Sequence, residues 1–176
     1  MNRIIIIISL LVITQLGVSQ NSSVIKWHSL QQALDLNKEN PKLIFIDVYT
    51  DWCGWCKKMD ADTFSKPYIA AYMNEKYYCV KLDAEGTDTV TYMGRTFTNT
   101  NPNGRRSTNQ IAAVLLQNKM SYPSYVFMNE KNQVLTVVKG YIEATKFDPI
   151  IHWFGEDAYK SQSYQEYASG FKKTAP

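Results

Sequence analysis

The residues of this chain best suited to chemistry are two cysteines, Cys53 and Cys56, in the stretch Trp-Cys-Gly-Trp-Cys at 52–56. Such a pair can hold half of a zinc site, form a structural disulfide, or act as a dithiol that exchanges with other disulfides. A structural zinc site needs a second close pair of ligands, and the sequence offers none, so no metal is predicted. A chain of 176 residues can bury a core without disulfide staples. The spacing therefore favours a working dithiol.

The surrounding sequence predicts that the pair lies where a strand passes into a helix. The run at 42–50 is almost continuously apolar or β-branched, as in a central strand covered on both faces. After Cys56, glycine and proline are absent until Pro67, which is typical of a helix. A further strand is predicted at Tyr78–Asp83, so the cysteines sit at the first turn of a β-α-β unit.

This placement predicts a role for each sulfur. The start of a helix stabilises a thiolate, the form that attacks disulfides, so Cys53 is the expected nucleophile. Cys56 lies one turn further on, with its side chain leaning back toward Cys53, and is the expected resolving cysteine. Gly54 between them permits a close approach.

Asp47 is a charged residue in the otherwise apolar strand before the cysteines. Burial without a partner would raise the pKa of its carboxyl toward neutrality, which suits a proton acceptor for Cys56. An exposed aspartate at the end of the strand is the alternative.

The stretch Phe-Ile-Asp-Val-Tyr-Thr-Asp-Trp-Cys-Gly-Trp-Cys-Lys-Lys-Met at 45–59 resembles the active-site region of the thioredoxin superfamily. Tyr-Pro-Ser-Tyr-Val-Phe at 122–127 resembles the cis-proline loop and closing hairpin of that family. The resemblance covers about residues 42–154 and is greatest to exported bacterial thioredoxin-like proteins. It implies an α/β fold, a thioredoxin-like three-layer sandwich with a mixed central sheet, and assigns the proton-acceptor role to Asp47.

The resemblance also implies a substrate-binding set around the dithiol. Pro123 is expected to be cis, with the backbone of Tyr122 pairing with a substrate strand; a trans proline that opens a strand is the alternative. Trp55 is expected to form an exposed apolar rim for docking, against a packing role. Trp52 is expected to pack partly against the strand layer, and Gly54 completes the set.

The span between the dithiol and Pro123 is longer than in a minimal thioredoxin, and the excess is a β-hairpin/helix insertion at about 86–118. Long connections often carry function. We expect this insertion to border the dithiol face and to restrict which substrates reach it. Its hairpin is predicted at 89–98 and its helix at 107–120.

Three local details of these elements are predicted as well. Gly94-Arg95 is expected to form a type II′ turn that sets Tyr92 opposite Phe97. The insertion helix is expected to be capped by Ser107 or Thr108. At the other end of the domain, Ser29 and Gln32 match a capping box that starts a helix.

Two further residues are expected to play no part in the chemistry. Cys79 lies within a strand and is expected to be a small buried hydrophobe. His152 lies off the apolar face of the last predicted long helix, so we expect it to face solvent; that face consists of Phe147, Ile150, Ile151 and Phe154.

The N-terminal residues match a secretory signal peptide. Arg3 precedes the apolar run Ile4–Ile13, and small residues, Gly17 and Ser19, follow. The run is too short to cross about 30 Å of hydrocarbon, although an uncleaved anchor is the alternative. We expect cleavage after Ser19, export to the periplasm or medium, and a single domain at 20–176.

The expected function is an exported thiol–disulfide oxidoreductase that reduces protein disulfides without a cofactor, as a monomer supplied by a possible membrane electron donor. The Trp-Cys-Gly start followed by Lys57 resembles reductases of the family. A disulfide oxidase or isomerase, and a thioredoxin-fold binding module without turnover, are the alternatives. The net charge of +3, from 19 basic and 16 acidic residues, is too small to predict nucleic-acid binding.

Overall fold

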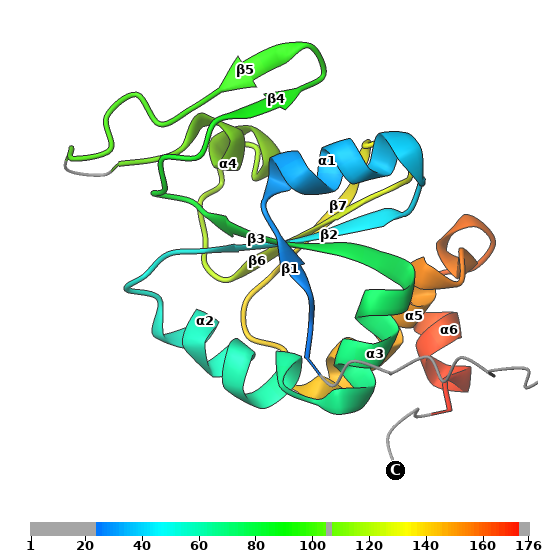
Figure 1. The fold of residues 1–176 in the computed structure, drawn as a ribbon. Coiled ribbons are helices and arrows are strands. Elements are labelled where there is room, and N and C mark those ends of the chain that lie inside the picture. Colours follow the sequence, from blue (N-terminus) through cyan, green and yellow to red (C-terminus); the bar gives the residue numbers. More distant parts are fainter. Residues whose placement is uncertain (1–23, 105–106, 173–176) are drawn as a thin grey trace, which may run out of the picture.

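A five-stranded mixed sheet forms the centre of the computed structural model, which describes residues 24–104 and 107–172 (Figure 1). Its strand order is β1-β3-β2-β6-β7. β1, β3 and β2 run parallel, whereas β6 is antiparallel to β2 and β7 is antiparallel to β6, which confirms the predicted mixed sheet. The strands span Trp27–His28 (β1), Leu43–Tyr49 (β2), Tyr77–Asp83 (β3), Ser124–Met128 (β6) and Val134–Lys139 (β7).

Helices cover both faces of this sheet and make the fold a three-layer sandwich (Figure 1). One face carries α1 (Leu30–Glu39) and α4 (Gln110–Leu115). The other face carries α2 (Gly54–Met59), its π-helical continuation η1 (Asp60–Phe64), α3 (Pro67–Lys76) and α5 (Ala144–Gly155). A 3₁₀ turn, η2 (Ala158–Lys160), and α6 (Tyr164–Gly170) follow and pack against α5. Within the described ranges, none of these helices has the length and apolar character that crossing a bilayer requires.

β2 is the central strand, and its side chains point alternately into two separate hydrophobic cores, one on each face of the sheet. Ile44, Ile46 and Val48 join the core beneath α1 and α4. Phe45 joins the other core, where the rings of Phe64 and other aromatic residues surround it at centroid distances from 5.2 to 6.5 Å. Both faces of the strand are buried, as its apolar sequence predicted, and Asp47 falls on the Phe45 face.

The capping box at the start of α1 is confirmed, but the predicted cap of the insertion helix is wrong. Ser29 accepts a hydrogen bond from the Gln32 backbone, and the Gln32 side chain accepts one from Ser29 N–H. α4 begins later than predicted, with Asn109 as its cap. The buried amide of Asn109 caps Ile111 N–H and donates to the carbonyls of Gly86 and Asp88, so it also ties the two ends of the insertion together.

The turn of the insertion hairpin lies one residue before its predicted position, which shifts each cross-strand partner by two residues. β4 (Val90–Tyr92) and β5 (Arg95–Phe97) place Tyr92 opposite Arg95, not opposite Phe97. The turn residues are Met93 and Gly94, both with positive φ, of 50° and 75°. A type I′ turn needs positive φ at both central positions and favours glycine at the second, which explains the shift.

The hairpin packs over α1, so for the hairpin the expectation that the insertion borders the dithiol face is wrong (Figure 1). The loop after the hairpin does approach the dithiol motif, since the Asn99 amide donates to the carbonyl of Glu85, whose carboxylate accepts from Trp52. The Thr91 backbone N–H donates to Gln31 Oε1 on α1 at 2.8 Å. The Tyr92 hydroxyl donates to the Asn132 carbonyl at 2.8 Å, in the β6–β7 turn at the end of β6 away from Pro123. The hairpin packs against α1 because its apolar side chains, Val90, Tyr92 and Phe97, are buried in the core beneath that helix. The predicted signal peptide, residues 1–19, lies outside the described residues.

Candidate active site

Cys53 and Cys56 form a disulfide at the junction of β2 and α2, where the sequence predicts a dithiol. Cys53 is the N-cap of α2, and its Sγ accepts a hydrogen bond from the Cys56 backbone N–H at 3.0 Å. The turn before it is closed by Cys53 N–H donating to the Thr50 carbonyl at 3.1 Å. A Cβ added to Gly54 would meet no atom within 4 Å apart from its chain neighbours and the backbone of its own helix, so the helix surface at Gly54 is open.

Two exposed tryptophans flank the buried cysteines. Cys53 and Cys56 are 4% and 2% exposed, whereas Trp52 and Trp55 are 66% and 59% exposed. The exposed position of Trp55 agrees with the predicted rim. The predicted packing of Trp52 against the strand layer is wrong, since its indole instead donates to Glu85 Oε2 at 3.1 Å.

The Tyr122–Pro123 peptide bond is cis, as the resemblance implied, and the loop that contains it meets the dithiol motif. The ring of Tyr122 meets the edge of Trp52 at a centroid distance of 5.8 Å. On the other side of the motif, Trp55 packs against Tyr141 at 5.6 Å. An aromatic pair thus stands on each side of the disulfide, and both pairs include a residue from beyond the insertion.

Asp47 is buried, so the alternative of an exposed aspartate is wrong. It is 1% exposed, and burial raises the pKa of its carboxyl to about 6, with the positive charge of Lys81 acting in the opposite direction. Its Oδ2 forms an ion pair with Lys81, whose Nζ lies 2.7 Å away. Its Oδ1 has no hydrogen-bond partner in the described part of the chain. Burial therefore raises the pKa even though Lys81 pairs with the carboxyl, and the proton-acceptor role stays a prediction.

Lys81 is the residue of this site that the sequence analysis missed. It lies on β3 directly beside Asp47, as its Cα partner in the parallel pair. Its ammonium also pairs with Asp60, the first residue of η1, and lies over the rings of Trp27 and Tyr49 at 5.1 Å from each. Burial lowers the pKa of Lys81, but Asp47 and Asp60 more than offset that effect and raise it. A lone lysine in an apolar strand next to the dithiol strand was the signal available in the sequence.

A protein-family model named Thioredox_DsbH, described as a protein of unknown function (DUF255), matches residues 17–153. The chain belongs to this DsbH-like thioredoxin family. Its fold is shared by a thioredoxin-fold protein from Helicobacter pylori, which is 12% identical with a TM-score of 0.60 over 86% of this chain and 93% of that one. A thioredoxin from Thermus thermophilus is 14% identical with a TM-score of 0.55 over 85% of this chain and 98% of that one.

Two curated proteins are similar to this chain over short segments only. Spermatogenesis-associated protein 20 of Mus musculus is 32% identical over 74 residues, which are 42% of this chain and 9% of the relative. Thiol:disulfide interchange protein DsbD of Vibrio vulnificus (strain CMCP6) is 41% identical over 46 residues, which are 26% of this chain and 8% of the relative. The matched segments therefore span less than a tenth of either relative.

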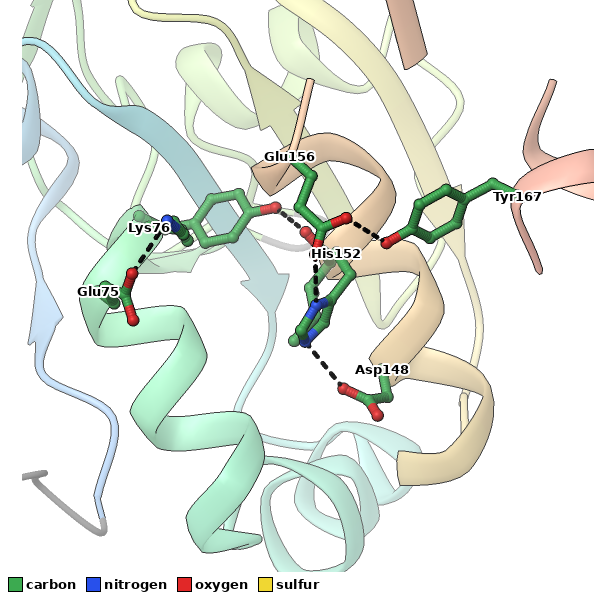
Figure 2. A network of polar contacts seen from close by, with 8 residues as sticks. Glu75, Lys76, Asp148, His152, Glu156 and Tyr167 are labelled. Atoms are coloured by element: carbon green, nitrogen blue, oxygen red, sulfur yellow. Dashed lines mark hydrogen bonds and ion pairs between the residues drawn. The ribbon is translucent and has the colours of Figure 1, made fainter. Parts of the chain in front are cut away.

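Cys79 and His152, the two residues expected to play no part in the chemistry, lie on β3 and α5. The burial of Cys79 is confirmed, and burial raises the pKa of its thiol. The predicted exposure of His152 is wrong: its ring lies between Asp148 and Glu156, with nitrogen–oxygen distances of 3.3 and 3.2 Å, because α3 and α6 cover this side of α5 (Figure 2). Across residues 24–104 and 107–172, no three His, Cys, Asp or Glu side chains are grouped so that they could hold a metal ion.

Proposed function

We propose that this chain is an exported thiol–disulfide oxidoreductase that reduces disulfides in protein substrates. One observation carries the proposal: the Cys53–Cys56 disulfide caps α2 directly after the strand whose buried Asp47 has a pKa raised to about 6. Family membership and the short match to a thiol:disulfide interchange protein support the same class of reaction.

In the reduced chain, Cys53 is the attacking thiolate. The Cys56 N–H that donates to its Sγ stabilises negative charge there. The Cys53 sulfur forms a bond to one sulfur of the substrate disulfide, and the substrate sulfur–sulfur bond breaks. The displaced substrate sulfur leaves as a thiolate and takes a proton from solvent.

Cys56 then resolves the mixed disulfide. Its thiol gives a proton to Asp47, and the new thiolate attacks the Cys53 sulfur. The Cys53–Cys56 bond forms, the bond to the substrate breaks, and the second substrate thiolate leaves. Two electrons have passed to the substrate, and the chain is left with the disulfide seen here.

Turnover requires a dithiol donor that reduces this disulfide again. In an oxidising compartment a membrane protein that carries electrons outward is the suitable class of donor. Export through a signal peptide over residues 1–19, cleaved near Ser19, is part of the proposal, as is action as a monomer. The chemistry uses no cofactor, because both electrons are held by the two sulfurs.

The exposed rim supports a protein substrate. Trp52 and Trp55 present large apolar surfaces on either side of the buried sulfurs, and the cis-proline loop at Tyr122 and Pro123 adjoins them. Aromatic side chains in such positions supply much of the binding energy at protein interfaces. An extended substrate strand pairing with the Tyr122 backbone would bring its disulfide over Gly54.

The same exposed tryptophans favour a second candidate, a binding module in which the dithiol has no role. The experiment compares the chain with a Cys53→Ser/Cys56→Ser double variant in reduction of a protein disulfide such as that of insulin. An oxidoreductase loses all turnover in the double variant. A chain that never reduces the disulfide, yet still binds its partner when both cysteines are serine, would be a binding module instead.

A further inference from the structure

Asp47 Oδ1 and the Tyr125 hydroxyl are two of the buried oxygen atoms that lack hydrogen-bond partners within the described part of the chain. Asp47 is 1% exposed and Tyr125 is fully buried. Polar atoms that are buried without a partner are destabilising and uncommon in native structures. Each of these two atoms therefore requires a partner.

The sheet brings the two residues together. Asp47 on β2 and Tyr125 on β6 are direct Cα partners in an antiparallel pair. Both point to the Phe45 face, where Tyr125 belongs to the same core as Phe45. Residues directly opposite on one face have Cβ atoms about 4.5–5.5 Å apart. The Tyr125 side chain therefore starts beside the Asp47 carboxyl.

The Tyr125 ring is fixed by its neighbours, so its hydroxyl has a defined position. It stacks on Phe45 with a centroid distance of 5.8 Å, and it meets Phe64 and Phe147 at 6.0 Å each. Burial, with the negative charge of Asp47 next in effect, raises the pKa of Tyr125. The hydroxyl thus keeps its proton and remains a hydrogen-bond donor, whereas Asp47 Oδ1 is an acceptor.

We propose that Tyr125 is a positioning residue for the dithiol reaction: its hydroxyl donates to a buried water that in turn donates to Asp47 Oδ1. A water that bridges two polar groups is nearly as favourable as a direct hydrogen bond. The Lys81 ammonium at Oδ2 already favours the carboxylate, whereas burial and the negative charge of Asp60 disfavour it. The bridge at Oδ1 adds to the effect of Lys81 and so keeps Asp47 able to take the Cys56 proton near neutral pH. The inference rests on the proposed function, because Asp47 acts only if Cys56 must lose a proton.

The test is Tyr125→Phe, which keeps every ring contact and removes one oxygen. The Asp47 carboxyl is titrated by ¹³C NMR in the full oxidised chain. The rate at which Cys56 resolves the mixed disulfide with a protein substrate is measured against pH in the reduced chain. We expect the Asp47 midpoint to rise by about one pH unit, since hydrogen bonds to a charged group have effects of this size. The rate should then fall about fivefold at pH 6 and less than twofold at pH 8.

Tyr72→Phe is the matched control. Its hydroxyl is the other tyrosine oxygen that is buried without a partner among the described residues, but it lies on α3 against His152, away from the dithiol. This variant should leave the Asp47 titration and the rate profile unchanged.

The outcomes separate the inference from the proposed function. A Tyr125→Phe chain with the wild-type Asp47 midpoint and the wild-type rate profile would overturn the inference and leave the oxidoreductase standing. A wild-type chain without turnover would overturn the proposed function. The Asp47 titration, which needs no turnover, would then still decide whether Tyr125 acts on that carboxyl.

Discussion

Lys81 holds the buried carboxyl of Asp47 from the neighbouring strand, with Nζ 2.7 Å from Oδ2, and shares its charge with Asp60 at the surface. The side chain of Asp47 is 2% exposed and that of Asp60 is 48% exposed. One ammonium thus links the interior carboxyl on β2, the strand that leads to the dithiol, to a solvent-facing carboxyl. The electrostatics of the site depend on this shared lysine as well as on the cysteines.

Replacing Asp47 should stabilise the fold while slowing the reaction. Its folded pKa of about 6 lies above its ordinary value of 3.8, so its destabilising effect is absent below about pH 4 and complete above about pH 6. Asp47→Asn should therefore raise the free energy of unfolding at pH 8 by about 3 kcal/mol and change it little at pH 4. Urea unfolding at both pH values measures this.

The control for that prediction is Asp62→Asn. Asp62 lies on η1 with Asp60, and its partly exposed carboxylate pairs with Lys58 and accepts from the Tyr141 hydroxyl. Its effect on stability should stay within about 1 kcal/mol at both pH values. An Asp47→Asn chain that is less stable at pH 8 than at pH 4, relative to wild type, would contradict the account.

Removing the shared lysine should lower the free energy of unfolding by an amount that depends on pH. A simple loss of packing would lower it equally at every pH. In Lys81→Met, burial acts on Asp47 without an opposing charge, so the pKa of Asp47 should rise further. The loss of stability should be several kcal/mol at pH 8, where a buried carboxylate is left unpaired, and smaller at pH 5, where Asp47 is protonated. Thermal unfolding across this pH range tests it, and equal losses at both pH values would count against the pairing.

Trp55 should matter for docking and not for folding. Because it is 59% exposed, Trp55→Ala should change the free energy of unfolding by about 0.5 kcal/mol or less. It should raise KM for a protein disulfide by about tenfold, since truncating an interface anchor costs more than about 1 kcal/mol, and leave the rate with glutathione disulfide unchanged. Met93→Ala, at the exposed tip of the hairpin, is the matched control. Equal loss with both disulfides would mean that Trp55 acts on the dithiol itself.

The insertion hairpin should contribute to stability and not to access. Tyr92→Phe removes the hydroxyl that donates to Asn132, which should lower the free energy of unfolding by about 1 kcal/mol. The rate of protein disulfide reduction should not change, because the hairpin lies over α1. An altered substrate rate in a folded Tyr92→Phe chain would restore the idea that the insertion controls entry.

The sequence was sufficient for features that depend on local pattern or on a resembling motif. The β2–α2 junction, the cap at Ser29 and the position of the dithiol follow from residues close together in the chain. The cis bond at Pro123 was reached only through the resemblance, since local sequence gives no reason for it.

The features that the sequence analysis missed depend on contacts between distant segments. Asp47 finds Lys81 because β2 and β3 pair in one register, which alternation along a single strand does not reveal. His152 is buried because α6 folds back over α5, although its place off the apolar face predicts exposure. The hairpin turn moved by one residue because positive φ at Met93 and Gly94 lets the apolar residues reach the core.

The measurement that tests the central claim most directly is the reduction potential of the Cys53–Cys56 pair, by equilibration of the full chain against glutathione. The account predicts a potential near about −270 mV or below, as for a dithiol that reduces protein disulfides. A potential near about −120 mV would mean an oxidant that introduces disulfides, and would contradict the proposed direction. A pair that never exchanges with glutathione would contradict the reaction itself.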